Sequence, residues 1–176
     1  KGTGRVDARD ISRTKTDLIR ENAIRQNFLN VVVTEKDATE LDSEALEKAD
    51  ILLADVPCSG LGVIGRKTDI KYNISQAGIQ ELAALQRKIL EQASTYVKPG
   101  GTLIYSTCTV TPEENVENVQ WFTEHYPYEL ESLDPYLCEE LRGETTKEGY
   151  LQLLPGIHHC DGFFIARLKR KTEWNR

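Results

Sequence analysis

Short apolar runs alternate with segments of helical periodicity along the whole chain, and this alternation constrains the fold more than any other feature. Strands are expected over residues 5–11, 31–34, 51–54, 102–105, 128–133, 150–154 and 162–168. Helical spacing of apolar side chains predicts helices over 12–30, over 75–97 before the stop sequence KPGG, and over 111–125 from Pro112 onward. This order predicts an α/β domain with a largely parallel sheet that ends in an antiparallel pair.

Length, composition and charge narrow the class of protein. With 176 residues, 39% of them hydrophobic and 28% charged, the chain suits one soluble globular domain. It lacks both an apolar run of the roughly 18 residues that span a membrane and a signal-peptide core, so we expect a cytoplasmic protein with no membrane partner. The net charge of −6 argues against binding of nucleic acid by bulk electrostatics, although it allows a local basic groove.

Two of the cysteines follow predicted strands and enter polar loops. Cys58 lies in the sequence DVPCSG after the run 51–54, and Cys108 lies in STCT after the run 102–105. A cysteine in a polar setting can become a nucleophilic thiolate, and parallel strands deliver such residues to one edge of a sheet. The two loops are therefore predicted to form one active site.

Other uses of cysteine fit the sequence less well. The four cysteines are widely spaced and form no CxxC pair, which disfavours a disulfide framework and a thioredoxin-like enzyme. His158, His159 and Cys160 are adjacent, which is poor spacing for tetrahedral zinc, so a metal site is disfavoured as well. A Cys-His protease is disfavoured because no histidine lies near a strand end of the α/β core.

Charged side chains also gather after the predicted strands. Asp10, Asp37 and Asp55 each follow one, and Asp10 is placed to accept hydrogen bonds from ribose hydroxyls. Any one of these acids is as readily a helix cap or a turn residue, but three at successive strand ends favour a ligand-binding edge. Arg66 and Lys67 lie just beyond the Cys58 loop, a position that favours contact with phosphate.

Taken together, these motifs resemble the RNA 5-methylcytosine methyltransferase family, in its bacterial branch that methylates 16S ribosomal RNA (the Sun/Fmu type). The matching segments are DIS at 10–12, EN at 21–22, DVPCSG at 55–60, KPGG at 98–101, STCT at 106–109, PEEN at 112–115 and DGFF at 161–164. They occur in the family's order along almost the whole chain. The segment around Arg66 departs from the family's pattern at Gly65 and Thr68.

The resemblance implies a fold and a reaction. The fold is a Rossmann-like class I sheet that uses S-adenosylmethionine as methyl donor, and the substrate is a cytosine in ribosomal RNA. The resemblance assigns attack on carbon 6 of the base to Cys108, release of the product to Cys58, and orientation of the base beside the donor to Asp55.

The remaining site residues follow from the same resemblance. Asp10 would hold the ribose of S-adenosylmethionine, and Asp37 the adenine side. Arg66 and Lys67 would hold the RNA backbone while the target base leaves its stack. A transfer RNA methyltransferase of the same family would use the same residues. A non-catalytic RNA-binding or assembly module is the other alternative, although it would have no need for both Cys58 and Cys108.

One element of the family is absent from the sequence. The glycine-rich donor-binding loop and the strand before it have no counterpart, so residues 1–176 are expected to form a single partial catalytic domain. A sheet without its central strand exposes backbone edges and an apolar face. We therefore expect this chain alone to bind S-adenosylmethionine weakly or not at all, to be inactive, and to self-associate.

Overall fold

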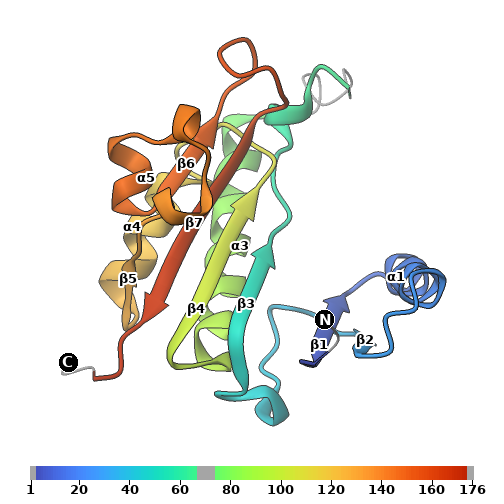
Figure 1. Cartoon of the computed structure of the whole chain (residues 1–176). Coiled ribbons are helices and arrows are strands. Elements are labelled where there is room, and N and C mark those ends of the chain that lie inside the picture. The colour runs from blue at the N-terminus through green and yellow to red at the C-terminus, as the bar shows by residue number, and fades with distance from the viewer. Residues whose placement is uncertain (1–2, 67–73, 174–176) are drawn as a thin grey trace. The chain divides into compact units, whose positions relative to one another are not determined.

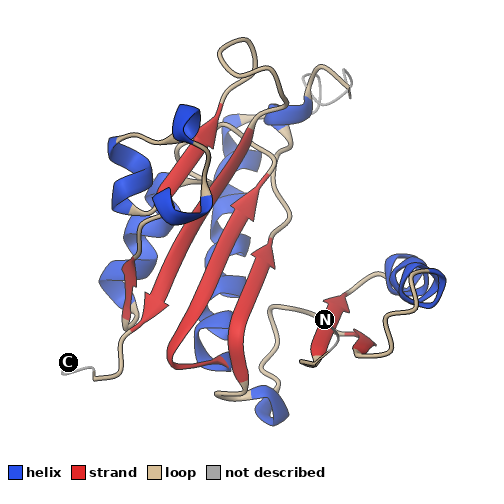
Figure 2. Cartoon of the chain, in the orientation of Figure 1, coloured by secondary structure: helices blue, strands red, loops and turns tan. Residues whose placement is uncertain are grey.

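The computed structural model describes residues 3–66 and 74–173, which separate into two compact units, Lys1–Leu41 and Asp42–Arg176. Each unit combines strands with helices, as Figure 2 shows. Parallel pairing occurs in both units, and antiparallel pairing occurs in the larger one. The predicted α/β fold class is confirmed, but the sheet of the larger unit is mixed where a largely parallel one was expected, because β7 pairs antiparallel with its neighbours.

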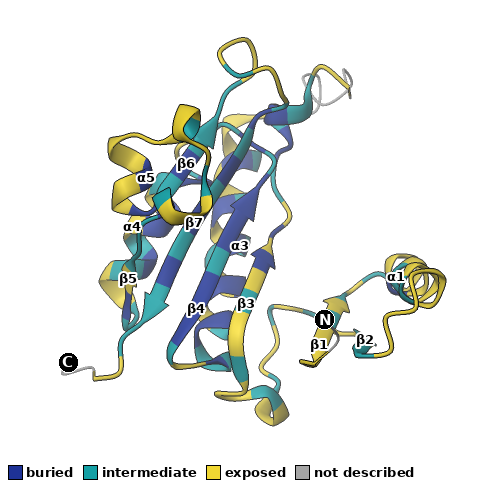
Figure 3. Ribbon diagram, in the orientation of Figure 1, coloured by how far each residue is buried: buried dark blue, intermediate teal, exposed yellow. Residues whose placement is uncertain are grey.

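The first unit is a short βαβ segment. Strand β1 (Val6–Asp10) pairs in parallel with β2 (Val31–Glu35), and helix α1 (Arg13–Arg25) connects them. Ser12 caps α1 as its sequence position predicts, since its hydroxyl accepts from the backbone N–H of Lys15. Of the described residues in this unit, Thr16 alone is buried (Figure 3). A unit with so little burial gains little stability from its own packing.

The second unit contains a five-stranded sheet in the order β3-β4-β7-β5, with β6 also paired to β7 (Figure 1). Its strands are β3 (Ala49–Asp55), β4 (Val97–Thr107), β5 (Tyr128–Leu130), β6 (Tyr150–Leu153) and β7 (Phe163–Arg170). Its helices are α3 (Gln76–Tyr96), α4 (Val116–His125) and α5 (Glu144–Glu148), with 3₁₀ turns η1 (Ser43–Ala45), η2 (Leu61–Val63), η3 (Asp134–Tyr136) and η4 (Glu139–Leu141). Strands β3 and β4 are parallel, whereas β7 is antiparallel to β4, β5 and β6, so the predicted final antiparallel pair is confirmed.

Helices α3 and α4 cover one face of this sheet and form its core (Figures 1 and 3). Leu90 of α3 and Phe122 of α4 pack with Leu103, Tyr105 and Phe164 of the sheet, all of them almost completely buried. On β3 the burial alternates. Leu52 and Ala54 belong to or pack against this core, while Ile51 and Leu53 are 71% and 66% exposed. One side of β3 therefore presents uncovered apolar surface.

Two predicted boundaries differ from the structure. The sequence KPGG was expected to separate helix from strand, but β4 already begins at Val97, which pairs with Ala49 before the register shifts. The second difference lies at Pro112, where a helix start was expected. Residues 112–115 form a turn, and α4 begins at Val116 because Asn115, with ψ of −101°, is not helical.

Candidate active site

The two strand-end cysteines lie in contact. The parallel pairing of β3 and β4 sets Asp55 opposite Ser106, so the loops that follow these residues leave the sheet side by side. The Sγ atoms of Cys58 and Cys108 are 3.2 Å apart, and both side chains are half-buried. The structure thus brings together the two loops that the sequence analysis placed in one active site.

The setting of Cys58 keeps its thiol protonated at neutral pH. Burial is the main cause that raises the pKa of the Cys58 thiol to about 12, and the hydrogen bond and charge of Cys108 contribute less. The backbone N–H groups of Gly60 and Cys108 lower this pKa, but by a smaller amount. A thiolate is the reactive nucleophile, so a cysteine held protonated suits hydrogen-bond donation better than attack.

Asp55 lies at the same edge of the sheet. It ends β3, is exposed, and accepts a hydrogen bond of 3.2 Å from the hydroxyl of Ser106. The carboxylate is therefore available beside the loop that carries Cys58, as expected for a residue that orients a base.

Asp10 and Asp37 belong to the first unit, in which Asp10 is the last residue of β1 and Asp37 lies in the loop after β2. Asp10 accepts from the backbone N–H of Ser12 at 2.8 Å and lies 3.4 Å from the ammonium of Lys15. Asp37 accepts hydrogen bonds from the hydroxyl and the backbone N–H of Thr39. Both bonds lower the pKa of its carboxyl group, and the bond from the hydroxyl has the larger effect. Both acids thus shape turns, which was the alternative for either one alone.

Of the predicted RNA-contact residues, Arg66 is described and Lys67 lies outside the described residues. The Arg66 guanidinium is exposed and forms an ion pair of 2.9 Å with Asp161. This contact ties the loop after β3 to the loop before β7.

A buried polar network around Glu114, which the sequence patterns did not predict, supports the two cysteine loops. Glu114 is completely buried and accepts hydrogen bonds from Ser59, Gln86 and Thr111. The neighbouring Asn115, also buried, bonds to the residues on both sides of Cys108. The only signal in the sequence was the segment PEEN, which had been noted for its resemblance and not for a function.

A close contact between backbones supports the Cys108 loop from another side. The N–H of Gly62 donates to the carbonyl of Cys108 at 3.0 Å, and the N–H of Gly162 donates to the carbonyl of Gly62 at 2.8 Å. A Cβ atom on Gly62 would lie 2.2 Å from the carbonyl oxygen of Gly162, so only glycine fits between the two backbones.

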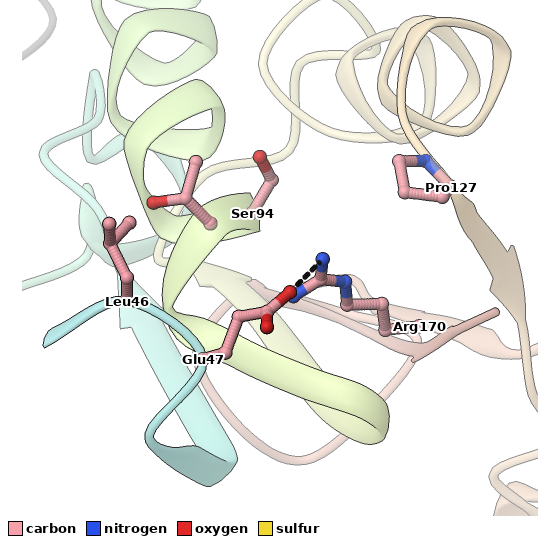
Figure 4. Close-up of a pocket in the computed structure, with 6 residues that line it drawn as sticks. Leu46, Glu47, Ser94, Pro127 and Arg170 are labelled. Atoms are coloured by element: carbon pink, nitrogen blue, oxygen red, sulfur yellow. Dashed lines mark hydrogen bonds and ion pairs between the residues drawn. The ribbon is translucent and has the colours of Figure 1, made fainter. Parts of the chain in front are cut away.

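A separate hollow lies at the other end of the strands, where β3 and β4 begin and β7 ends. Figure 4 shows this hollow, which has a volume of about 360 Å³ and is lined by Leu46, Glu47, Ser94, Thr95, Pro127 and Arg170. The Arg170 guanidinium donates to the carbonyl of Val97 and forms an ion pair of 2.7 Å with Glu47. Its charge is therefore already engaged in joining chain segments, away from the thiols.

Among the residues that the structure describes, no group of three His, Cys, Asp or Glu side chains is arranged to hold a metal ion. In the same part of the chain, no helix is both long enough and apolar enough to cross a membrane.

The fold of this chain, with its site at the strand ends, belongs to the class of Rossmann-like methyltransferase folds. The solved structure of PH0851 is 31% identical, with a TM-score of 0.85 over 95% of this chain and 37% of that chain. The structure of NSun6 from Pyrococcus horikoshii with SFG is 28% identical, with a TM-score of 0.78 over 98% of this chain and 43% of that one.

Sequence comparison defines the family within this class. The chain belongs to the 16S rRNA methyltransferase RsmB/F family, whose sequence model matches residues 1–169. It is 38% identical over 171 residues to the ribosomal RNA small subunit methyltransferase F of Cronobacter sakazakii, which covers 97% of this chain. The chain spans 36% of the length of that relative.

Proposed function

We propose that this chain belongs to a cytoplasmic enzyme that transfers a methyl group from S-adenosylmethionine to carbon 5 of a cytosine in ribosomal RNA. The observation that carries the proposal is the contact of 3.2 Å between the Sγ atoms of Cys58 and Cys108, at the ends of adjacent parallel strands. Membership of a 16S rRNA methyltransferase family supports the substrate. In this proposal residues 1–176 form a single partial catalytic domain.

Carbon 5 of cytosine is too weak a nucleophile to take a methyl group from a sulfonium donor without activation. The Cys108 thiolate adds to carbon 6, and the electron pair of the carbon 5–carbon 6 double bond then makes carbon 5 enamine-like. S-adenosylmethionine, when bound, supplies the methyl group. Water takes the proton from carbon 5, and the electron pair of that C–H bond restores the double bond to carbon 6. The bond between carbon 6 and the sulfur of Cys108 breaks, and its electron pair returns to the sulfur as a thiolate.

Cys58 acts in the release step. Its thiol stays protonated because of its raised pKa, and it lies within hydrogen-bond distance of the Cys108 sulfur. A hydrogen bond from the Cys58 thiol stabilises the negative charge that Cys108 regains as it leaves carbon 6. Asp55, exposed at the end of β3, orients the base by hydrogen bonding to its polar edge.

The carboxylates at the strand ends suit the methyl donor. Asp10 accepts from the ribose hydroxyls and Asp37 from the adenine side, while Asp55 lies beside the donor as well as the base. A carboxylate has the acceptor chemistry that hydroxyl and amino groups require, which supports these roles. Arg66 and Lys67 hold the RNA backbone while the target base is turned out of its stack.

The names of the relatives favour ribosomal RNA over transfer RNA as substrate. A non-catalytic RNA-binding module is disfavoured by the contact between the two thiols, since binding RNA requires neither.

Methylation at carbon 5 can be tested by incubating the full-length protein with a ribosomal RNA substrate that carries tritium on carbon 5 of cytosine. Methylation at carbon 5 replaces this hydrogen, so tritium is expected to appear in the solvent in proportion to methyl transfer. A matched RNA with tritium on carbon 6 should retain its label. Methyl transfer without release from carbon 5 would show that the methyl group goes elsewhere.

We also propose that the 176-residue chain alone binds S-adenosylmethionine weakly or not at all, is inactive, and self-associates. The exposure of Ile51 and Leu53 on β3, and the small number of buried residues in the first unit, support this proposal. Calorimetric titration with the donor should show no saturable heat, and sedimentation velocity should show species larger than a monomer. Micromolar donor binding by a monomeric chain would contradict both parts.

A further inference from the structure

The carboxylate of Glu114 is buried and held by neutral donors. It is 0% exposed, and its two oxygens accept from the N–H of Ser59 (2.8 Å), the hydroxyl of Ser59 (2.5 Å), the amide of Gln86 (2.9 Å) and the hydroxyl of Thr111 (2.8 Å). A buried carboxylate is costly to desolvate, and an apolar side chain in its place would avoid that cost. The number of bonds indicates that Glu114 fixes the position of its partners.

These partners enclose Cys58. Ser59 follows Cys58 directly, and Gln86 also donates to the carbonyl of Pro57, the residue before it, at 2.9 Å. The peptide groups on both sides of Cys58 are therefore tied to Glu114, one of them directly and the other through the Gln86 side chain. Rotation of this loop away from β4 would break bonds to a buried charge, which are stronger than those between neutral groups.

Asn115, the residue after Glu114, holds the loop that carries Cys108. Asn115 accepts from the hydroxyl of Thr107 at 2.6 Å and donates to the carbonyl of Thr109 at 3.1 Å. A direct bond of 2.7 Å between the hydroxyls of Ser59 and Thr109 joins the two loops. Because residues 112–115 form a turn and not a helix, the adjacent side chains of Glu114 and Asn115 can reach different loops.

We propose that Glu114 is a positioning residue of the two-cysteine site: it holds the Cys58 loop against the Cys108 loop and so sets the distance between the two thiols. The effect on methylation rests on the proposed function, whereas the effect on the thiol distance does not. A glutamine at this position offers a single oxygen, and its N–H₂ group would face donors that need an acceptor. The loop would then shift to satisfy them.

The thiol distance can be measured by oxidation, independently of RNA. Diamide takes two electrons and two protons from a pair of thiols and leaves a disulfide, and the rate of this reaction depends on how often the sulfurs meet. Peptide mass spectrometry would follow the Cys58–Cys108 disulfide in the full-length protein. We expect Glu114→Gln to slow its formation on the order of 10-fold or more. Glu113→Gln, the same change at the adjacent residue, should react as the wild type does.

Steady-state kinetics would test whether the position of the two thiols affects the rate of methyl transfer. Glu114→Gln should lower kcat for methyl transfer on the order of 10- to 100-fold while the KM for RNA stays near the wild-type value, because the RNA-contact residues are unchanged. Ser59→Ala removes the hydroxyl that bonds both Glu114 and Thr109, and it should slow disulfide formation in the same direction. It serves as the test if Glu114→Gln does not fold.

The outcomes separate the two proposals. Wild-type rates of disulfide formation in Glu114→Gln, or in Ser59→Ala if the first variant is unfolded, would overturn the positioning role. A wild-type protein that releases no tritium from carbon 5 would instead overturn the proposed function, and the oxidation rates would still report on the role of Glu114.

Discussion

Replacement of Cys108 with alanine is expected to abolish methyl transfer, by on the order of 10⁴- to 10⁶-fold, the scale on which enzymes respond to loss of a nucleophile. Without the sulfur no bond to carbon 6 forms, and carbon 5 stays unreactive. Cys58→Ala is expected to behave differently. Attack by Cys108 remains possible, but the neighbouring thiol that lies 3.2 Å from its sulfur is gone, so release is slow.

RNA that contains 5-fluorocytosine distinguishes these two defects. The fluorine on carbon 5 cannot leave as a proton does, so the wild-type enzyme should form an adduct that survives denaturing electrophoresis. Cys108→Ala should form none, whereas Cys58→Ala should accumulate an adduct even on ordinary RNA. Cys160→Ala, at an exposed free cysteine, provides the control and should match the wild type. An adduct that depends on Cys58 and survives loss of Cys108 would reverse the two roles.

Gly62→Ala is expected to damage the site without touching either cysteine. The added methyl group would lie 2.2 Å from the carbonyl oxygen of Gly162 and 2.7 Å from that of Cys108, and both are backbone atoms that cannot rotate away. Forcing extra volume into a packed site costs about 1–3 kcal/mol of stability. The same displacement moves the Cys108 backbone, and a shift of about 1 Å at a reacting group lowers activity on the order of 100-fold.

Denaturant unfolding and the tritium-release assay would measure the two effects of Gly62→Ala. Gly65→Ala is a matched control, because a Cβ atom on Gly65 meets nothing within 4 Å and the residue is exposed. It should leave both the free energy of unfolding and the activity near wild-type values. Unchanged stability and activity in Gly62→Ala would mean that the contact between Gly62 and Gly162 is looser than these distances indicate.

The secondary structure could largely be predicted because its causes are local. The cap at Ser12, the β-branched run of β2 and the apolar stripe of α3 each depend on residues a few positions apart. The prediction was wrong at Pro112. Proline followed by acidic residues is typical of a helix start, but Glu114 bonds to Ser59, which is distant in sequence, and Asn115 bonds back to Thr109. The turn that these residues form delays α4 to Val116.

The sequence by itself determined that two cysteines follow two strands of an α/β fold, because periodicity and turn residues are local signals. Only the tertiary structure decided which groups surround the sulfur atoms. The contact between Cys58 and Cys108 joins residues 50 positions apart, and the hydrogen bond between Ser59 and Glu114 joins residues 55 positions apart. The burial that holds the Cys58 thiol protonated depends on the whole fold. Such contacts depend on how strands and helices pack, and the local pattern of residues carries no record of that packing.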